Sequence, residues 1–417
     1  MQSDAGLEGF DRLRVREVQT NYGHTASTFL AKFQSTVTSL KPDERIKLVY
    51  THESMESLKA VLADPEANKI CSLHWTYYEK EDVTPIIPLL IHNCPELASL
   101  VVDFKEFSAF DFVSSLLEHP SNRIKVLDIS PNTKGDLARF FAALRQSQMS
   151  ALALCYSPKF AQGFCEYLAR DLLVRLKVRM KRNQVPLELM VSLADCTRLA
   201  KLELIECEFS EWTVFTLPKS ITKLRLFDCT FVGRFDWLFL ADSNVRELDV
   251  LHVRGVDGNQ LGSALAVHLR AKGLDKLRFI YCDFTNETLA AAGVELGRIK
   301  ILDIDDHLSD ASIELIALAL KSPNNEMKEL KLEYDRGAAS IENYLMPALK
   351  HPNCNLVKLG LCTKEPYREA ATRRVNYTFR NRLALFVLLQ GRQLRRRYCP
   401  LRRLPVEMFR LVGKALI

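Results

Sequence analysis

The sequence predicts an α/β solenoid of about 12–13 repeats, stacked side by side around a parallel sheet. One pattern, apolar-x-x-Leu-x-apolar, recurs in twelve segments that start 22 to 29 residues apart. A fixed period in this range is typical of stacked repeats, because each short unit must bury its apolar face against its neighbours. The twelve leucines are Leu73, Leu100, Leu127, Leu152, Leu176, Leu202, Leu224, Leu248, Leu277, Leu302, Leu330 and Leu359. A weaker thirteenth copy begins at Ile46 and has Val49 at the leucine position.

Residues 1–45 precede the array and lack the leucine pattern. Between residues 25 and 40 the apolar side chains recur at helical spacing, as Phe29, Phe33 and Val37 illustrate. The end of a solenoid would expose its core without a cap. We therefore expect residues 1–45 to form an N-terminal helical cap.

Residues 46–363 form the expected array, in which each unit opens with a short strand of alternating apolar residues. Apolar residues at helical spacing predict a helix after several of these strands. Three of the predicted helices cover residues 257–270, 286–296 and 310–321. The units that start at Leu199 and Ile221 are shorter, so we expect turns or a single helical turn there.

Three units carry a longer motif with a cysteine at its ninth position. They are Leu199-x-x-Leu202-x-Leu204-x-x-Cys207-x-Phe209, Ile221-x-x-Leu224-x-Leu226-x-x-Cys229-x-Phe231 and Leu274-x-x-Leu277-x-Phe279-x-x-Cys282-x-Phe284. The pattern resembles leucine-rich repeats of the ribonuclease-inhibitor-like and cysteine-containing-like kinds, over about three quarters of the chain. The resemblance implies a horseshoe or arc, with a parallel sheet on its concave side and helices and turns on its convex side. Asn132 is the only asparagine at the ninth position and the unit lengths are mixed, which leaves the curvature open.

The cysteines of this motif invite a metal interpretation, but a structural one fits better. Cys207, Cys229 and Cys282 share one repeat position, which in leucine-rich repeats points inward and hydrogen-bonds the turn after the strand. Zinc needs a tetrahedral set of ligands, which a stack of thiols does not supply. We expect no metal site and no cofactor.

The fifth position of the pattern is expected to face outward, because side chains alternate along a strand. From the sixth unit to the twelfth, this column is Lys177, Glu203, Arg225, Asp249, Arg278, Asp303 and Lys331. The signs alternate without a break, so each charge would lie between two opposite ones. The column is either a solvated ladder that avoids like-charge repulsion or a strip that recognises a polar protein surface. A self-neutralised strip is a poor track for a polyanion, which argues against nucleic-acid binding there.

The seventh position is apolar in four successive units and is also expected to face outward. These residues are Ile205, Phe227, Leu251 and Ile280. Exposed apolar patches rimmed by charge often mark protein-binding sites, although another segment could cover this one. If the stripe is a contact surface, exchanging Phe227 and Leu251 for Asp abolishes partner capture and leaves thermal unfolding nearly unchanged. Loss of folding would instead show that the stripe belongs to the core.

A basic segment, residues 364–417, follows the array and carries a net charge of +11, whereas the rest of the chain carries −5. We expect it to contain helices. One hypothesis is a C-terminal cap whose arginines are solvated. A second is a nuclear-import or nucleic-acid patch centred on residues 395–397.

A third hypothesis is that the basic segment binds a partner through a helix that starts at Pro405. The residues of this hypothesis are Leu404, Pro405, Met408, Phe409 and Val412. Leu404-Pro405-Val406-Glu407 resembles the opening of an F-box, and F-box proteins act as substrate receptors of ubiquitin ligases. The resemblance covers about fourteen residues, the later helices of an F-box are missing, and a pair of helices like a SOCS box is an equally loose comparison.

The sequence shows no motif for catalysis. It contains no phosphate loop, no Gly-x-Ser-x-Gly elbow and no His-Glu-x-x-His. No secretory signal and no bilayer-spanning apolar run is evident, which favours a cytoplasmic or nuclear protein. We expect a non-enzymatic scaffold that binds an unidentified protein on its concave face, centred on the residues of the two columns. The alternatives are a substrate-recognition subunit of a ubiquitin ligase and, third, a nuclear or nucleic-acid-binding protein that acts through its basic tail.

Overall fold

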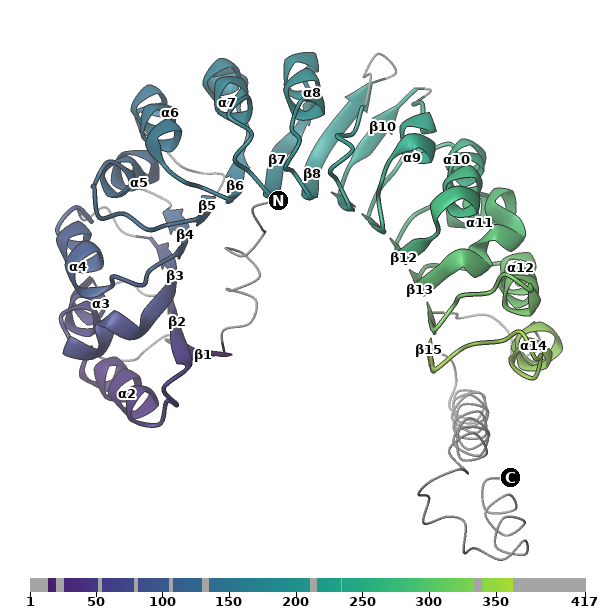
Figure 1. Ribbon diagram of the computed structural model, residues 1–417, viewed down its shortest axis with the longest axis horizontal. Coiled ribbons are helices and arrows are strands. Elements are labelled where there is room, and N and C mark those ends of the chain that lie inside the picture. The colour runs from purple at the N-terminus through teal and green to yellow at the C-terminus, as the bar shows by residue number, and fades with distance from the viewer. Residues whose placement is uncertain are drawn as a thin grey trace, which may run out of the picture. The chain divides into compact units, whose positions relative to one another are not determined.

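The computed structural model describes residues 14–19, 26–51, 55–78, 82–104, 108–129, 135–210, 216–233, 235–333 and 340–362. Contacts divide the chain into two compact units, residues 1–208 with 213–221 and residues 209–212 with 222–417. In each unit, parallel strands follow one another in chain order and alternate with helices (Figure 1). The α/β class and the parallel repeat solenoid that the sequence predicts are confirmed.

Unit 1 contains the first strands and helices of the array. Its strands are β1 (Arg14–Gln19), β2 (Glu44–Thr51), β3 (Ile70–Tyr77), β4 (Ser99–Phe104), β5 (Val126–Ile129), β6 (Ala151–Cys155), β7 (Arg175–Gln184) and β8 (Lys201–Ser210), the last of which runs past the unit boundary. Its helices are α2 (Ala26–Thr38), α3 (Met55–Leu62), α4 (Ile86–Asn93), α5 (Ala109–Leu117), α6 (Leu137–Gln146), α7 (Ala161–Leu168) and α8 (Leu187–Ala194).

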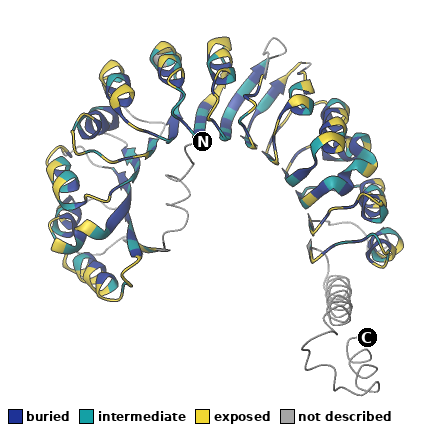
Figure 2. Ribbon diagram, viewed as in Figure 1, coloured by how far each residue is buried: buried dark blue, intermediate teal, exposed yellow. Residues whose placement is uncertain are grey.

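Unit 2 repeats the same alternation with one exception, a short second strand that follows the first without a helix between them. Its strands are β9 (Lys223–Phe227), β10 (Thr230–Val232), β11 (Glu247–Leu251), β12 (Leu274–Ile280), β13 (Ile299–Asp305), β14 (Glu329–Glu333) and β15 (Lys358–Cys362). Its helices are α9 (Leu238–Asp242), α10 (Gly258–Lys272), α11 (Thr285–Ala292), α12 (Asp310–Lys321) and α14 (Met346–Leu349). The single turn of α9 is the short return segment expected for the unit that starts at Ile221. Figure 2 shows that buried residues concentrate along the strands and that exposed residues gather on the outer sides of the helices.

The leucine column forms the core, because each leucine lies beside the equivalent leucine of the next strand. In unit 2, Leu248 pairs in register with both Leu224 and Leu277, and all three are at most 1% exposed. One assignment at the start of the array was wrong. Leu48, not Val49, lies opposite Leu73, because the register between β2 and β3 shifts after Ile46.

The sheet also begins earlier than the expected array. β1 pairs in parallel with β2, with Val18 opposite Leu48, so a strand precedes the boundary drawn at residue 46. α2 occupies the segment where the Phe29 periodicity predicts a helix, and Phe29 and Phe33 are fully buried. Residues 364–417 lie outside the described part of the chain.

Two helices of unit 2, α10 and α12, begin at residues whose side chains cap them. Asp257 accepts hydrogen bonds from the backbone N–H groups of Asn259 and Gln260 at the start of α10. The start of α12 is capped by Ser309 and not by Asp310. Where the sequence predicts one helix over 286–296, the chain forms α11 and then a 3₁₀ turn, with a glycine at positive φ, Gly293, between them. Among the described helices, none is both long and apolar enough to cross a membrane.

Candidate protein-interaction surface

The charged column of the sequence is aligned in unit 2. Asp249 lies in register with Arg225 on one side and Arg278 on the other. Asp303 likewise lies between Arg278 and Lys331. These five side chains are partly or fully exposed and follow one line across β9, β11, β12, β13 and β14.

Ion pairs tie this line together. Asp303 is close to two cations, Arg278 Nε at 3.3 Å and Lys331 Nζ at 3.5 Å, and its side chain is 13% exposed. Asp249 pairs with Lys276 Nζ at 3.4 Å, a residue of the third-position column of the repeat. Each partly exposed pair contributes only about 0–1 kcal/mol. Because the cations Lys276, Arg278 and Lys331 each lie beside a carboxylate, this charged ladder leaves little uncompensated positive charge for a polyanion.

In unit 1, Lys177 of β7 lies opposite Glu203 of β8, as the sequence predicts. Lys177 Nζ also reaches Asp128 Oδ2 at 3.4 Å, although Asp128 lies two strands away. Ala153 occupies the strand between them, and its methyl group leaves the path open. The alternation of charge thus continues along unit 1 across a small residue.

The apolar stripe is much less exposed than strand alternation predicts. Leu251 is 4% exposed, Ile280 is 8% exposed, and Ile205 in unit 1 is 6% exposed. Phe227 alone of the four is half-buried. In unit 2 the three side chains lie opposite one another in register, and strands about 4.8 Å apart let such large side chains bury each other. Asp at Leu251 would consequently place a charge in a buried position, so that substitution tests stability and not binding.

The exposed aromatic residues lie one position further along the chain. His252 and Tyr281 follow the seventh-position residues and adopt left-handed backbone conformations, with φ of 54° and 51°. Their N–H groups donate to the carbonyl oxygens of Ile280, at 2.8 Å, and Asp305, at 2.9 Å, in the next strands. These bonds hold each turn in place against the cost of a left-handed conformation.

Phe227, His252 and Tyr281 form a continuous row of rings, which we call the aromatic row. The ring centroids of Phe227 and His252 are 5.6 Å apart, and those of His252 and Tyr281 are 5.1 Å apart. The guanidinium of Arg225 lies 5.8 Å from the centroid of the Phe227 ring. Tyr281 is 59% exposed and His252 is also exposed. The row therefore joins the charged ladder to an accessible aromatic surface.

Two members of this row, His252 and Tyr281, are not evident in the repeat pattern. The eighth position of the repeat reads Glu206, Asp228, His252 and Tyr281, which looks like an unrelated set of turn residues. All four have positive φ in the structure. A turn that repeats at one position, occupied by aromatic residues in two neighbouring units, is the signal that could have identified them.

The cysteine column is structural, as expected. Cys207, Cys229 and Cys282 are buried, and each thiol lies 3.4–3.5 Å from the carbonyl oxygen two residues before it. Burial raises the pKa of the Cys282 thiol to about 12, so it stays protonated. No group of three or more potential metal ligands occurs in the described ranges.

Asp306, which lies just after β13 and near the ladder, also has a structural role. Asp306 Oδ2 accepts hydrogen bonds from the backbone N–H of Cys282, at 3.0 Å, and the hydroxyl of Thr285, at 2.6 Å. The carboxylate thereby joins β13 to the start of α11. This arrangement accounts for Asp306 without acid–base chemistry.

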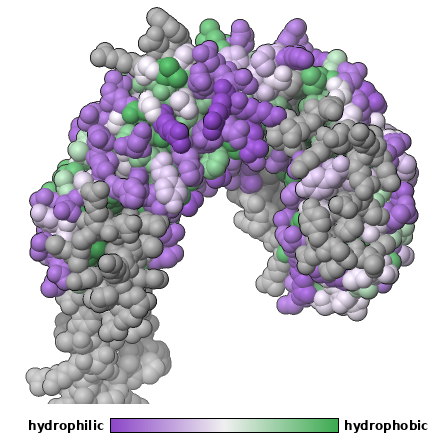
Figure 3. Space-filling model, turned by 180° about the vertical axis from the view of Figure 1, so that it is seen from behind, coloured by the Kyte–Doolittle hydropathy of each residue, from purple (hydrophilic) through white to green (hydrophobic). Residues whose placement is uncertain are grey.

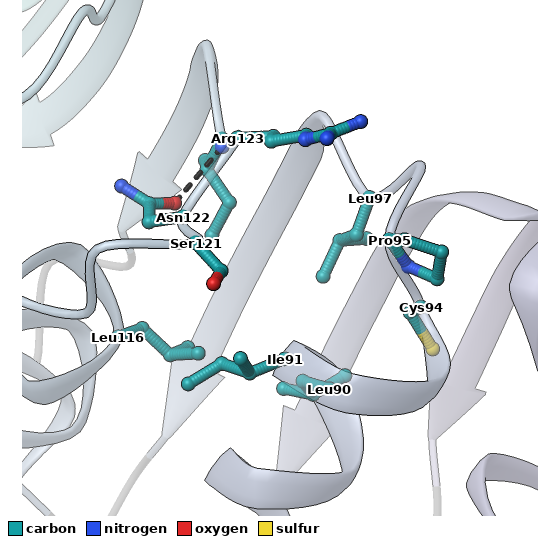
Figure 4. Close-up of a pocket in the computed structure, with 10 residues that line it drawn as sticks. Leu90, Ile91, Cys94, Pro95, Leu97, Leu116, Ser121, Asn122 and Arg123 are labelled. Carbon is teal, nitrogen blue, oxygen red and sulfur yellow. Dashed lines mark hydrogen bonds between the residues drawn. The ribbon is translucent and has the colours of Figure 1, made fainter.

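A small pocket in unit 1 lies between α4 and the segment that leads into β5 (Figure 4). Leu90, Ile91 and Leu116 line its floor, and the Ser121 hydroxyl points inward. The dashed line in Figure 4 is the backbone N–H of Ile124 donating to Asn122 Oδ1 at 2.9 Å. The cavity volume of ≈ 20 Å³ suits about one water molecule, far below the roughly 300 Å³ of a typical ligand site.

The tail residues proposed to bind a partner lie outside the described residues. They are Leu404, Pro405, Met408, Phe409 and Val412.

On the described part of the surface that Figure 3 shows, hydrophilic residues dominate and hydrophobic residues are scattered among them. No family model matches the sequence, and a search of curated proteins found no match.

Proposed function

We propose that this protein is a non-enzymatic scaffold that binds another protein through the sheet face of unit 2. The observation that carries the proposal is the aromatic row beside the charged ladder. Tyr is enriched in the energetic centres of protein interfaces, and surrounding charged groups usually form the rim. The face combines both features within a few neighbouring strands.

The proposal includes membership of the leucine-rich-repeat family. Two columns support it, the leucines at the fourth position and the inward cysteines at the ninth. Each of these thiols is directed inward and lies close to the carbonyl oxygen of the strand residue two positions before it. Stacked repeats present long continuous surfaces, and their usual role is binding.

A charge swap tests whether the ladder recognises a partner or only stabilises the sheet. In Arg278→Asp with Asp303→Arg, the pair survives with its direction reversed, although the new charges then lie opposite the like charges of Asp249 and Lys331 on its two flanks. Arg278→Asp alone instead places a carboxylate between those of Asp249 and Asp303. Because contacts between partly exposed charges are worth only about 0–1 kcal/mol each, the swapped protein should melt only slightly below the wild type. The proposal predicts that it captures its partner at least about tenfold more weakly, a loss of about 1.4 kcal/mol in binding free energy.

Affinity capture from native lysate with quantitative mass spectrometry provides the measurement, with thermal unfolding as the control for folding. The single variant Tyr281→Ala should lose the same partner. If both the swapped protein and Tyr281→Ala retain every wild-type partner, the sheet face of unit 2 is not the binding surface.

A second proposal, that the protein is a substrate receptor of a ubiquitin ligase, rests on Leu404-Pro405-Val406-Glu407. In this case the sheet face holds the substrate and the tail holds the ligase adaptor. Full-length protein with Leu404→Ala and Met408→Ala should lose the adaptor and keep the partner of the sheet face. Failure of the wild-type chain to recover any adaptor rejects the second proposal alone.

A further inference from the structure

The aromatic row has dimensions that suit one kind of peptide. Its three rings lie at the ends of β9, β11 and β12, which are consecutive in the sheet, with His252 and Tyr281 directly after their strands. Two strand spacings separate the outer strands, a distance of about 9.6 Å. A polyproline II helix repeats every third residue with a rise of about 9.3 Å. Two prolines three residues apart would therefore meet the Phe227 end and the Tyr281 end of the row.

The rings also have the character that proline recognition requires. Polyproline II segments dock on aromatic surfaces, and their preformed shape reduces the entropy lost on binding. Phe227, His252 and Tyr281 lie on a folded sheet, and the left-handed turns at His252 and Tyr281 are each held by a backbone hydrogen bond. The backbone that carries the rings of His252 and Tyr281 is therefore held in place on the sheet before a ligand binds.

Charge at one end of the row supplies an orientation. Asp283 follows Tyr281 by two residues and is exposed. Its carboxylate has no ion pair or hydrogen bond with any residue that the structure describes, unlike Asp249 and Asp303 of the ladder. An unpaired carboxylate at this place favours a lysine or arginine beside the prolines.

Single-stranded nucleic acid is the other ligand that stacks on aromatic rows, and the charges disfavour it. Such ligands need a groove of uncompensated positive charge that follows the phosphates. Near this row, Arg278 is paired with Asp303 and Lys276 with Asp249, and the guanidinium of Arg225 lies against the ring of Phe227. The surroundings therefore suit a peptide better than a polyanion.

We propose that the aromatic row binds a proline-rich segment in the polyproline II conformation, with two prolines three residues apart and a basic residue near the Asp283 end. This inference rests on the proposed function and names the chemical class of its partner. It makes Phe227 and Tyr281 the contacts for the two prolines, with the exposed ring of His252 between them, and Asp283 the contact for the basic residue.

Fluorescence anisotropy with the full-length chain tests the inference. The probe is a labelled peptide that contains Pro-x-x-Pro and one arginine. Its length of about twelve residues corresponds to about four turns of a polyproline II helix. Its matched controls move the second proline by one position, exchange arginine for glutamate, or replace both prolines by glycine. We expect saturable binding of the first peptide only, and weakening of at least about tenfold in Tyr281→Ala and His252→Ala.

Two further variants make the assignment specific. Leu238→Gln changes an exposed apolar residue of α9 in the same unit and should bind the peptide like the wild type. Asp283→Lys should weaken the arginine peptide and bind the glutamate peptide more tightly. Wild-type melting temperatures for all variants would show that losses of binding do not reflect unfolding.

The outcomes separate this inference from the function on which it rests. Equal binding of the spaced and shifted peptides, no peptide binding at all, or tighter binding of a labelled oligothymidine overturns the inference. If lysate partners nevertheless depend on Tyr281, the proposed scaffold function stands and its ligand is of another class. If neither peptide nor lysate partners depend on Tyr281, both fail.

Discussion

At the scale of single residues, His268 is a titratable group held inside the core. It lies in α10, is 0% exposed, and its Nε2 is 2.8 Å from the carbonyl oxygen of Val245. Because a carbonyl oxygen can only accept, Nε2 carries the proton of a neutral ring. Burial lowers the pKa of His268 below its ordinary value of 6.5.

This histidine predicts a loss of stability in mild acid. Above pH 6.5 the ring is neutral in both the folded and the unfolded chain. Between pH 6.5 and the lower pKa of the folded state, this histidine is protonated in the unfolded chain, whereas the buried ring of the folded chain stays neutral. The free energy of unfolding should fall by up to about 1.4 kcal/mol per pH unit in this window.

Urea unfolding of wild type and His268→Gln between pH 7.5 and 5.5 provides the measurement. Glutamine retains an N–H donor for Val245 but does not titrate, so its curve should fall less steeply than that of the wild type. His74, whose pKa burial also lowers, is present in both proteins and cancels in the comparison. Parallel curves would show that His268 does not contribute.

At the scale of elements, α10 and α11 approach each other through glycines. A Cβ at Gly262 would lie 2.4 Å from the carbonyl oxygen of Thr288 and 2.6 Å from Ala291 Cβ. A Cβ at Gly258 would lie 2.7 Å from the carbonyl oxygen of Phe284. These neighbours belong to backbone or to short side chains, which cannot swing aside. The two glycines, which lie inside the helix predicted over residues 257–270, therefore allow close helix packing.

Gly262→Ala should destabilise the protein although alanine is the better helix former. The gain in helix propensity is about 1 kcal/mol, whereas overpacking a tight contact costs about 1–3 kcal/mol. The steric cost dominates because two contacts fall below 3.0 Å at once. Thermal unfolding provides the measurement, with Ser263→Ala, an exposed position on the same helix, as the control. A more stable Gly262→Ala protein would show that α10 and α11 can move apart.

At the scale of the whole molecule, the repeats of each unit contact mainly their neighbours in the sheet. Stability in such an array is a sum of repeat and nearest-neighbour terms. In unit 2, Leu248 lies between Leu224 and Leu277 and is 0% exposed. Removing its side chain should therefore weaken its own repeat and the two beside it most strongly.

Leu248→Ala is expected to cost about 2–5 kcal/mol. Hydrogen exchange should show the largest loss of amide protection in β9, β11 and β12 and a smaller loss in β15. Leu359→Ala, at the equivalent position of β15, is the matched control and should show the reverse order. Equal loss of protection across all strands of unit 2 would mean that the unit unfolds as one cooperative block.

Much of the architecture follows from local sequence pattern. The leucine column predicts the strands and their order, and the alternating charges at the fifth position align in register because equivalent positions of stacked repeats meet. The pattern was less reliable at irregular points. The shift after Ile46 depends on pairing between strands, which is why Leu48 takes the place assigned to Val49.

By itself, the sequence determined the repeat, the parallel sheet, the inward cysteines and the alternating charge of one column. These follow from period and alternation, which are local properties of the chain. Only the tertiary structure decided which outward residues are accessible. Leu251 and Ile280 are buried against each other across neighbouring strands, whereas His252 and Tyr281, one position further, are turned outward by backbone bonds to the next strand. Accessibility depends on contacts between repeats, and no single repeat encodes them.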